Sequence, residues 1–312
     1  MKNELIKILS TAIKFIIIFI LIDFSLGTIA TKLIYAQKTG KYGKLIEGLD
    51  KSNAAIFVFG SSHALRHYDN DLIEQQYQSS CYNVGSKGQK MLFQTVLLKT
   101  LLERHAPKTI ILDIDDDWLY EFPAAYDRLG ALHPFYSKHR KVLRQSLQEY
   151  DKYTGLKLAF KSYQQNSTFL HVVRYFLFPE PKSTNGFEPL NGKLNASDSV
   201  HLKEIFNTVN TNTKKIDTNF IHSLEAFIQL SKSNNIELVL CISPNLYYNN
   251  EKDNISYHKI IDIAKSNHIL LYDFTNDTKF LNQYTLFNDV DHLNIDGAKL
   301  YTQQLLDSLL NK

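Results

Sequence analysis

Five short apolar segments, separated by helical patterns, set the rhythm of the sequence from residue 54 onward. Each segment is a continuous apolar run, which is typical of parallel strands whose two faces are both covered by helices. The runs are AAIFVFG (54–60), CYNVG (81–85), TIILDI (109–114), IELVLCIS (236–243) and ILLYDF (269–274). Helical periodicities lie near residues 88–104, 218–233, 255–266 and 295–310. This alternation predicts an α/β fold built on a doubly wound parallel sheet of about five strands.

One long stretch, from about residue 118 to about residue 217, departs from this pattern. It is rich in Tyr, Phe, Lys, Ser and Asn and shows no clear strand–helix repeat. We expect an irregular or helical insertion that lies over the carboxyl edge of the sheet, where active-site loops gather. A surface elaboration without a role in chemistry explains the same composition.

The N-terminus carries an apolar stretch, residues 12–30, with an unbroken run from Phe15 to Ile22. A bilayer span needs about 20 residues, so this segment qualifies if Lys14 snorkels and Asp23 is tolerated. A carboxylate at such a depth often marks a partner group inside the membrane. It also fits a position near the far headgroups.

Three interpretations fit this segment. A signal-anchor fits best, because Lys2 and Lys7 precede the apolar run and no small-residue cleavage site follows it. A cleaved signal peptide is the second, and a buried helix of a soluble domain is the third. Because large domains cross the membrane with little regard for flanking charge, we expect a cytoplasmic N-terminus and an exported remainder. This predicts a single-pass membrane anchor with its juxtamembrane segment over 1–35 and an extracytoplasmic domain over 36–312.

Charge and short motifs argue against several classes of partner. Lys and Arg total 35 and Asp and Glu 32, a net charge of +3, so no nucleic-acid partner is expected. No GxGxxG follows the first predicted strand and no GxxxxGK(S/T) occurs, which disfavours a nucleotide-binding domain. Cys81 and Cys241 form no CxxC pair or Cys/His cluster. We therefore expect neither a metal nor a cofactor.

The first predicted strand ends in Gly60-Ser61-Ser62-His63 at the start of a helix. A serine placed there stands at the carboxyl edge of the sheet, where the first helical turn offers backbone N–H groups to a developing oxyanion. Gly60 lets the chain turn sharply. A serine that only caps the helix is the ordinary alternative.

Near the other end of the chain, NDVDHLN (288–294) precedes the last predicted helix, which Asn294 can cap. An aspartate three residues before a histidine can fold back so that its carboxylate accepts the imidazole Nδ1–H. Nε2 is then free to take a proton from a serine. A polar loop with a helix cap is the ordinary alternative. The occurrence of both motifs at opposite ends of one α/β pattern favours Ser62, His292 and Asp289 as a catalytic triad.

The two end motifs resemble sequence blocks of the SGNH (GDSL-like) hydrolase superfamily. Gly60-Ser61-Ser62 is similar to the first block, with Ser62 in the nucleophile position and Ser61 where aspartate is usual. Asp289-Val290-Asp291-His292 is similar to the last block, DxxH. The resemblance implies a flavodoxin-like sheet, with His292 as general base and Asp289 as the residue that orients it.

The middle blocks match less closely. Asn83-Val84-Gly85 resembles the second block, which implies that Gly85 donates a backbone N–H to the oxyanion hole beside that of Ser62. The third block is normally GxND, but the matching strand end here has Asp115 and no asparagine. An ionised Asp115 facing an oxyanion would oppose catalysis. Either Asp115 turns away, or Asn83 or Gln89 completes the hole, or two backbone donors suffice.

Several other residues lie on segments expected near the pocket. His63, Tyr136, Asn245 and Tyr247 are candidate substrate contacts, together with Gln89 and Asp115.

The form GSSH…NVG…DHLN further resembles membrane-anchored, exported proteins related to those of alginate and teichoic-acid O-acylation. This resemblance implies a membrane-tethered serine esterase or O-acyltransferase that acts on acylated cell-envelope glycan. The alternative is a catalytically inactive scaffold that binds glycan or a membrane acyltransferase partner. The aspartate-rich third block and Asp23 motivate that alternative.

Overall fold

The computed structural model describes residues 2–165, 169–179, 183–195 and 214–310. The chain divides into two compact units, each described by itself below. The helical unit comprises residues 1–43 and 129–182, and the sheet unit comprises residues 44–128 and 183–312. The helices after residue 128 thus belong to the same compact unit as the N-terminal helix, and the division at residue 35 stays a prediction.

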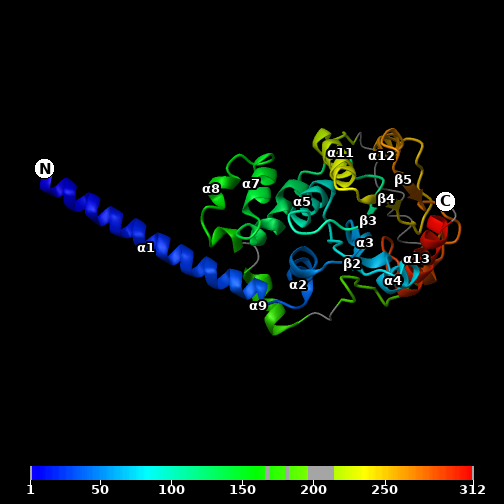
Figure 1. Cartoon of the computed structure of the whole chain (residues 1–312), viewed down its shortest axis with the longest axis horizontal. Helices are drawn as coiled ribbons and strands as arrows, with labels where there is room; N and C mark the ends of the chain where they lie inside the picture. Colours follow the sequence, from blue (N-terminus) through cyan, green and yellow to red (C-terminus); the bar gives the residue numbers. More distant parts are fainter. Residues whose placement is uncertain (1, 166–168, 180–182, 196–213, 311–312) are drawn as a thin grey trace. The chain divides into compact units, whose positions relative to one another are not determined.

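A five-stranded parallel sheet forms the centre of the sheet unit (Figure 1). Its strands are β1 (Ile56–Phe59), β2 (Cys81–Asn83), β3 (Thr109–Asp113), β4 (Glu237–Ile242) and β5 (Leu270–Asp273). The strand order is β2-β1-β3-β4-β5, and every pairing is parallel. From β1 the chain adds β2 on one side, and β3 and the later strands are added on the other side. The strand order therefore reverses between β1 and β3, and ligands of such sheets usually bind at this point. The prediction of a doubly wound α/β sheet is confirmed.

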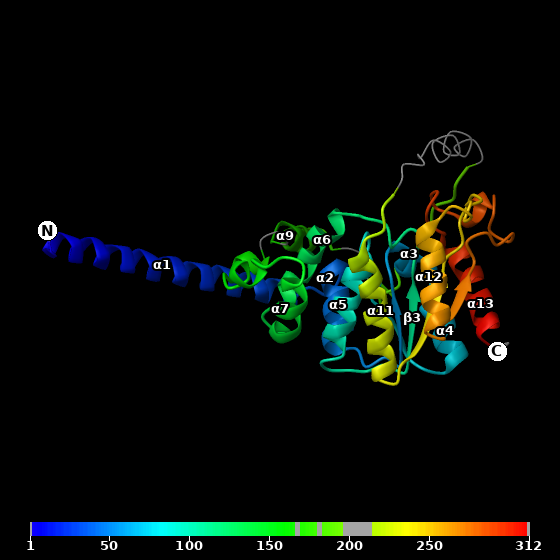
Figure 2. The same cartoon turned by 90° about the horizontal axis from the view of Figure 1, so that it is seen from above.

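Helices cover both faces of this sheet (Figure 2). One face carries α3 (Ser62–His67), α4 (Asn70–Tyr77) and α13 (Ile295–Leu310), and the other carries α5 (Met91–Leu101) and α11 (Thr218–Ser233). α12 (Ile255–Ser266) packs along β5. Side chains of β1 alternate between the faces, as in any strand. Val58 joins the cluster under α13, whereas the ring of Phe59 contacts Phe227 of α11 at 5.4 Å between centroids.

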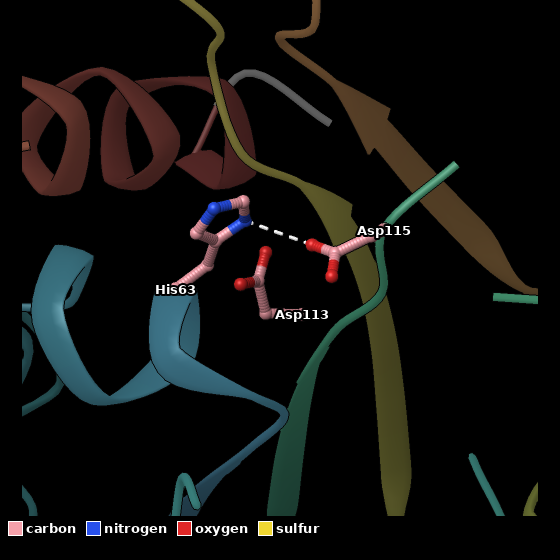
Figure 3. Close-up of side chains that lie close together, drawn as sticks. All are labelled: His63, Asp113 and Asp115. Atoms are coloured by element: carbon pink, nitrogen blue, oxygen red, sulfur yellow. Dashed lines mark ion pairs between the residues drawn. The ribbon is translucent and has the colours of Figure 1, made fainter. Parts of the chain in front are cut away.

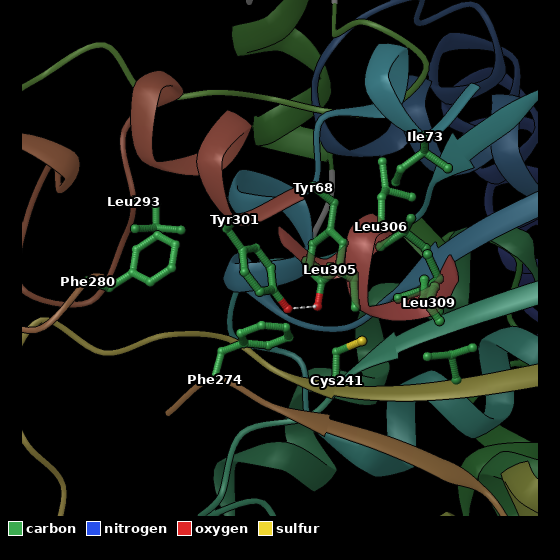
Figure 4. Close-up of a cluster of buried hydrophobic side chains, with 14 of the residues drawn as sticks. Tyr68, Ile73, Cys241, Phe274, Phe280, Leu293, Tyr301, Leu305, Leu306 and Leu309 are labelled. Atoms are coloured by element: carbon green, nitrogen blue, oxygen red, sulfur yellow. Dashed lines mark hydrogen bonds between the residues drawn. The ribbon is translucent and has the colours of Figure 1, made fainter. Parts of the chain in front are cut away.

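The core beneath α13 holds the loop that precedes this helix (Figure 4). Tyr301 is fully buried and packs edge to face on Tyr68 and Phe274, with ring centroids 5.3 and 5.2 Å away. Leu293 is also fully buried in this cluster. Burying a side chain of that size stabilises a fold by about 1.5–3 kcal/mol. Because Leu293 follows His292 directly, the core fixes the position of that histidine.

The helical unit consists of one long helix and several short ones. Its elements are α1 (Lys2–Tyr35), the start of α2 (Gly40–Ile46), η2 (Leu129–Phe135), α7 (Arg140–Gln148), α8 (Thr154–Lys157), η3 (Tyr163–Gln165) and α9 (Phe169–Leu177). Among the described residues, α1 is the helix long and apolar enough to cross a membrane by length and composition. This finding is consistent with a single-pass anchor or a signal sequence.

Part of the predicted insertion returns to the sheet unit. Residues 183–195 run beside α3 and the loop before α13. The Glu188 N–H donates to the Leu65 carbonyl at 3.0 Å, and the Leu194 N–H donates to the Phe287 carbonyl at 3.0 Å. This segment therefore borders the carboxyl edge of the sheet.

Candidate active site

Ser62 stands at the junction between β1 and α3. The connecting Gly60 has φ +144°, and a Cβ there would lie 2.7 Å from both the Asp113 carbonyl oxygen and the Ala64 Cβ. Only glycine tolerates this conformation and this close approach. Two donors hold the Gly60 carbonyl, the Ser86 N–H at 3.0 Å and the Gln94 side-chain amide at 2.8 Å. The turn presents Ser62, half-buried, at the carboxyl edge of the sheet.

A compact loop carries the other two residues of the predicted triad. Asp289 Oδ1 accepts the backbone N–H groups of Asp291 and His292 at 3.0 and 2.9 Å, so the carboxylate folds back over its own loop. Asn294 then caps α13 by accepting the Gly297 N–H at 3.0 Å. The sequence predicted both this cap and the returning carboxylate.

The structure brings Ser62, His292 and Asp289 together. His292 Nε2 lies 2.8 Å from Ser62 Oγ, and His292 Nδ1 lies 2.8 Å from Asp289 Oδ1. If Nδ1 carries the proton, it donates to the carboxylate, and Nε2 can accept the hydroxyl proton of Ser62. Residues 230 positions apart are thus joined in one hydrogen-bonded line.

The electrostatics of Asp289 suit this arrangement. Burial raises the pKa of Asp289, but hydrogen bonds from His292, Asp291 and Asn288, together with the charge of His292, lower it to about 2. Asp289 is therefore ionised at any ordinary pH and can stabilise a positive charge on His292.

His63 and Asp115 form a second histidine–aspartate pair (Figure 3), and the His63 ring lies 5.6 Å from the His292 ring of the triad. His63 Nδ1 is 2.8 Å from Asp115 Oδ1, and Trp118 Nε1–H donates to Asp115 Oδ2 at 2.6 Å. Both oxygens of Asp115 thus have partners, and a neighbouring imidazole can neutralise its charge. The sequence raised the concern that a charged Asp115 would repel the oxyanion. In the structure this concern does not hold, because the carboxylate is bound by His63 and Trp118.

The charge state of His63 follows from this pair. Burial lowers the pKa of His63, but the charge and the hydrogen bond of Asp115 have a larger, opposite effect, and the net result is a pKa raised to about 10. An unfolded histidine has a pKa near 6.5. The pair therefore stabilises the fold fully below about pH 6.5, and this contribution is lost as the pH rises through about 10.

We expect the substitution His63→Gln to destabilise the protein more at pH 6 than at pH 10. The melting temperature of the variant should lie roughly 4 °C or more below that of the wild type near pH 6, with the gap closing toward pH 10. Thermal unfolding of both proteins across this range checks the prediction. A gap of equal size at both ends would show that the pair is not charged as described.

Two further residues, Asp113 and His67, lie next to this pair, and neither was identified from the sequence. Asp113, the last residue of β3, accepts the hydroxyls of Tyr68 and Ser243 on its Oδ1 at 2.9 and 2.8 Å. His67 is fully buried, stacks on His63 at 4.7 Å and accepts the Leu293 N–H on Nε2 at 3.0 Å. The spacing of His63 and His67, one helical turn apart, was the available signal for His67.

Burial accounts for the charge states of these two residues. It holds the pKa of His67 well below the usual range, and nearby His63 and His292 lower it further, so His67 is neutral. Burial raises the pKa of Asp113, although the charge of His63 and the hydrogen bonds from Ser243 and Tyr68 oppose the shift. His67 therefore acts as a neutral support that ties α3 to the His292 loop.

Within the part of the chain that the structure describes, His63, Asp113 and Asp115 form the group that could hold a metal ion, since their ligand atoms lie within 4.8 Å of one another. A cation at this point would have to replace the His63–Asp115 hydrogen bond, and Asp113 Oδ1 already accepts two hydroxyls. Hydrogen bonding within the cluster explains most of its geometry without an ion. That the protein needs no metal stays a prediction.

The predicted oxyanion-hole donors need a correction. The Gly85 N–H donates to Asn83 Oδ1 at 2.9 Å, and Asn83 Nδ2 donates to the Ala64 carbonyl at 2.6 Å. These bonds tie β2 to α3 and occupy both groups. A Cβ on Gly85 would lie 2.6 Å from the Leu65 nitrogen, so this glycine permits close packing beneath α3. The Ser62 N–H, in the first turn of α3, remains as the predicted backbone donor.

The predicted substrate contacts have separate outcomes. Gln89 is buried, with its amide 3.3 Å from the Arg128 carbonyl. Tyr247 was wrongly expected at the pocket: it is 4% exposed and lies in the core cluster, against Tyr284. Tyr136 is buried in the helical unit. Asn245 is half-buried beyond β4, where its N–H bonds the Thr275 carbonyl, and its role stays a prediction.

Comparisons with known proteins complete this description. No family model matches the chain, and no curated protein matches it in sequence. Its structure is similar to that of an acetyl xylan esterase, with 14% identity, 81% of this chain and 98% of that chain covered, and a TM-score of 0.39. It is also similar to a lipolytic G-D-S-L-family protein from Desulfitobacterium hafniense (14% identity; 81% and 97% covered; TM-score 0.37). A third similar structure is an acylhydrolase from Bacteroides fragilis (11% identity; 82% and 87% covered; TM-score 0.36). At these TM-scores the likeness adds no argument about chemistry, which has to come from the site itself.

Proposed function

We propose that this protein is a serine esterase or O-acyltransferase, tethered to the membrane by α1, that acts on acylated cell-envelope glycan. The observation that carries the proposal is the line of atoms from Ser62 Oγ through the His292 ring to Asp289, with both distances at 2.8 Å. This is the arrangement that nucleophilic acyl transfer requires. The glycan and the export come from the sequence resemblance, and the length and composition of α1 support the tether.

The proposed reaction has two half-steps. Ser62 Oγ attacks the acyl carbonyl carbon while His292 Nε2 takes the hydroxyl proton, and Asp289 stabilises the resulting imidazolium. The ester C–O bond breaks, the leaving alkoxide takes the proton from His292, and the acyl group stays on Ser62. A water molecule or a sugar hydroxyl then gives its proton to His292 while its oxygen attacks the acyl carbon. The bond between this carbon and Ser62 Oγ breaks, His292 returns the proton to Oγ, and the free acid or the acylated sugar leaves.

Charge around Ser62 favours the tetrahedral intermediate. The Ser62 N–H at the start of α3 is the donor that we assign to the oxyanion. His63 adds a cation next to the nucleophile, with Asp115 balancing it from the side. Asp115 stands at the sequence position where the resemblance implied an asparagine. Its role here is to pair with His63.

The acceptor decides between esterase and transferase. The full chain in detergent is supplied with a chromogenic acetyl ester, with and without an oligosaccharide acceptor, and the chromophore and the sugar products are measured. Chromophore release without acceptor identifies an esterase, whereas acceptor-dependent release with acetylated sugar identifies a transferase. Absence of both activities overturns the proposal. Glycan binding that persists in Ser62→Ala without turnover in the wild type would point to the inactive scaffold instead.

A further inference from the structure

The first part of α1 contacts little of the described protein. Every residue from Lys2 to Ile22 is exposed, and the large apolar side chains between Leu5 and Ile22 are 48–69% exposed. An 18-residue window of this helix has a mean hydropathy of 2.5, and none of it is buried. Residues 2–22 rise about 31 Å at 1.5 Å per residue, close to the thickness of a bilayer core. Lipid is the solvent that covers such a surface at least cost.

The environment of the helix changes at Asp23. From this residue onward one side of α1 is covered, with Gly27, Ala30 and Ile34 buried. Within the bare part, Lys7 lies near the N-terminal end, and its long stem can reach toward the headgroups there. The change therefore indicates that α1 leaves the lipid near Asp23.

Asp23 binds another segment of the helical unit. Its Oδ2 accepts the Lys161 N–H at 2.8 Å, and its Oδ1 accepts the Ser162 N–H at 3.0 Å and the Ser162 hydroxyl. One turn further on, a Cβ at Gly27 would lie 2.4 Å from the Lys161 carbonyl carbon, so only glycine admits this backbone. Another turn on, Thr31 Oγ1 accepts the Gln165 amide at 3.1 Å. The stripe Asp23–Gly27–Thr31 holds residues 161–165 at the level where α1 leaves the lipid.

We refer to the contacts of Asp23, Gly27 and Thr31 with residues 161–165 as the clamp. Three side chains that precede residue 161 are apolar and exposed. Leu156 is 67% exposed, Tyr153 is 56% exposed and Phe160 is 41% exposed, and we refer to these three side chains as the α8 surface. The Phe160 ring lies against Phe19 of the bare helix at 5.9 Å, which makes the α8 surface continuous with the part of α1 that lipid covers. Lysines accompany it: Lys161 Nζ sits 4.4 Å from the Phe24 ring centroid. Aromatic side chains interleaved with lysines are typical of the bilayer interface.

We infer that the α8 surface inserts into the headgroup–acyl boundary of the bilayer that α1 spans, so that the helical unit rests on the membrane. Asp23 is then the carboxylate that fastens this surface to the anchor, and its charge is satisfied by backbone N–H groups. This inference rests on the proposed membrane tether. It adds a second attachment, which restrains how the chain can move relative to the lipid.

Fluorescent probes on single cysteines test this inference in the full chain. The two native cysteines are 2% and 0% exposed, so a thiol-reactive, environment-sensitive dye will select an engineered cysteine. The dye is placed at Leu156→Cys, and the protein is reconstituted into phosphatidylcholine vesicles with and without doxyl-labelled lipid. We expect quenching at Leu156→Cys to exceed about half of that at Ile18→Cys, a position inside the proposed span.

Ile18 on α1 and Ala36 directly after α1 supply the controls. Ala36→Cys lies 13 residues beyond Asp23 and should be quenched least, since it is in water under this account. Quenching at Leu156→Cys equal to that at Ala36→Cys, with strong quenching at Ile18→Cys, would overturn the inference while leaving the tether intact. Weak quenching at all three positions would defeat the tether as well. In the Leu156→Cys background, Gly27→Leu should lower quenching by pushing residues 161–165 off the helix. Unchanged quenching there would contradict the clamp.

Discussion

Replacing Ser62 by alanine is expected to lower ester turnover by about 10⁴- to 10⁶-fold, the effect of removing the nucleophile from a serine triad. In the structure the Ser62 hydroxyl lies 2.8 Å from His292 Nε2, the atom that would take its proton. Ser62 is also half-buried at the start of a helix, where alanine is well tolerated, so the fold should persist. Initial rates with a chromogenic acetyl ester, at matched protein concentration, measure the loss.

The chain offers a matched control one residue away. Ser61 precedes α3 as its N-cap residue, yet its side chain makes no capping hydrogen bond. Ser61→Ala should therefore retain turnover within a few-fold of the wild type. If Ser61→Ala lost as much activity as Ser62→Ala, or if Ser62→Ala kept most of its activity, the assignment of the nucleophile would be wrong.

The second large effect is expected from Asp289→Asn, which should lower turnover by about 10²- to 10⁴-fold. Because the pKa of Asp289 is about 2, its charge is present at every practical assay pH, and the substitution removes it throughout. The neutral amide stabilises the His292 imidazolium less well, and it can place an N–H where Asn288 now donates to Oδ2 at 3.0 Å. Rates measured across the pH range, with melting temperatures, separate this chemical effect from unfolding.

Asp291→Asn is the appropriate comparison for Asp289→Asn. It makes the same change of charge in the same loop, on an exposed side chain two residues away. We expect it to alter turnover only a few-fold, since its carboxylate lies outside the triad. Equal losses in the two variants would mean that the loop acts through its overall charge and that Asp289 has no specific role.

The sheet was accessible from the sequence because each strand is short, apolar and flanked by helical periodicity. The predicted runs contain β1 to β5, and the predicted helices α11 and α12 have the observed bounds. β5 shows the limit of this argument: its run is as apolar as the others, yet it forms an edge, with Leu270 42% exposed. Hydropathy alone does not distinguish an edge strand from a central one.

The site was accessible only in part, because its members are joined by tertiary contacts. The turn at Gly60 and the Asx-type loop at Asp289 are local features, and local features leave sequence signals. The bond between Gly85 and Asn83 and the pair formed by His63 and Asp115 depend on how β2, α3 and β3 meet. A motif therefore identified the right segments but misassigned Gly85, whose N–H faces the neighbouring side chain.

The helical unit was the least predictable part. Between Leu129 and Leu177 the chain forms short helices that pack against α1 and against one another. No single hydrophobic period therefore dominates this part of the sequence. The sequence did mark Asp23 as anomalous in an apolar helix. Only the structure identifies its partners, the N–H groups of Lys161 and Ser162, which lie 138 and 139 residues away.

The central claim is that Ser62, activated by His292, is a nucleophile. The most direct test is to treat the full chain with a fluorophosphonate and to locate the phosphonyl adduct by tandem mass spectrometry. The account predicts one adduct, on Ser62, that is absent from Ser62→Ala and formed far more slowly in His292→Gln. No adduct on the wild type, or an adduct on another residue that persists in Ser62→Ala, would contradict it.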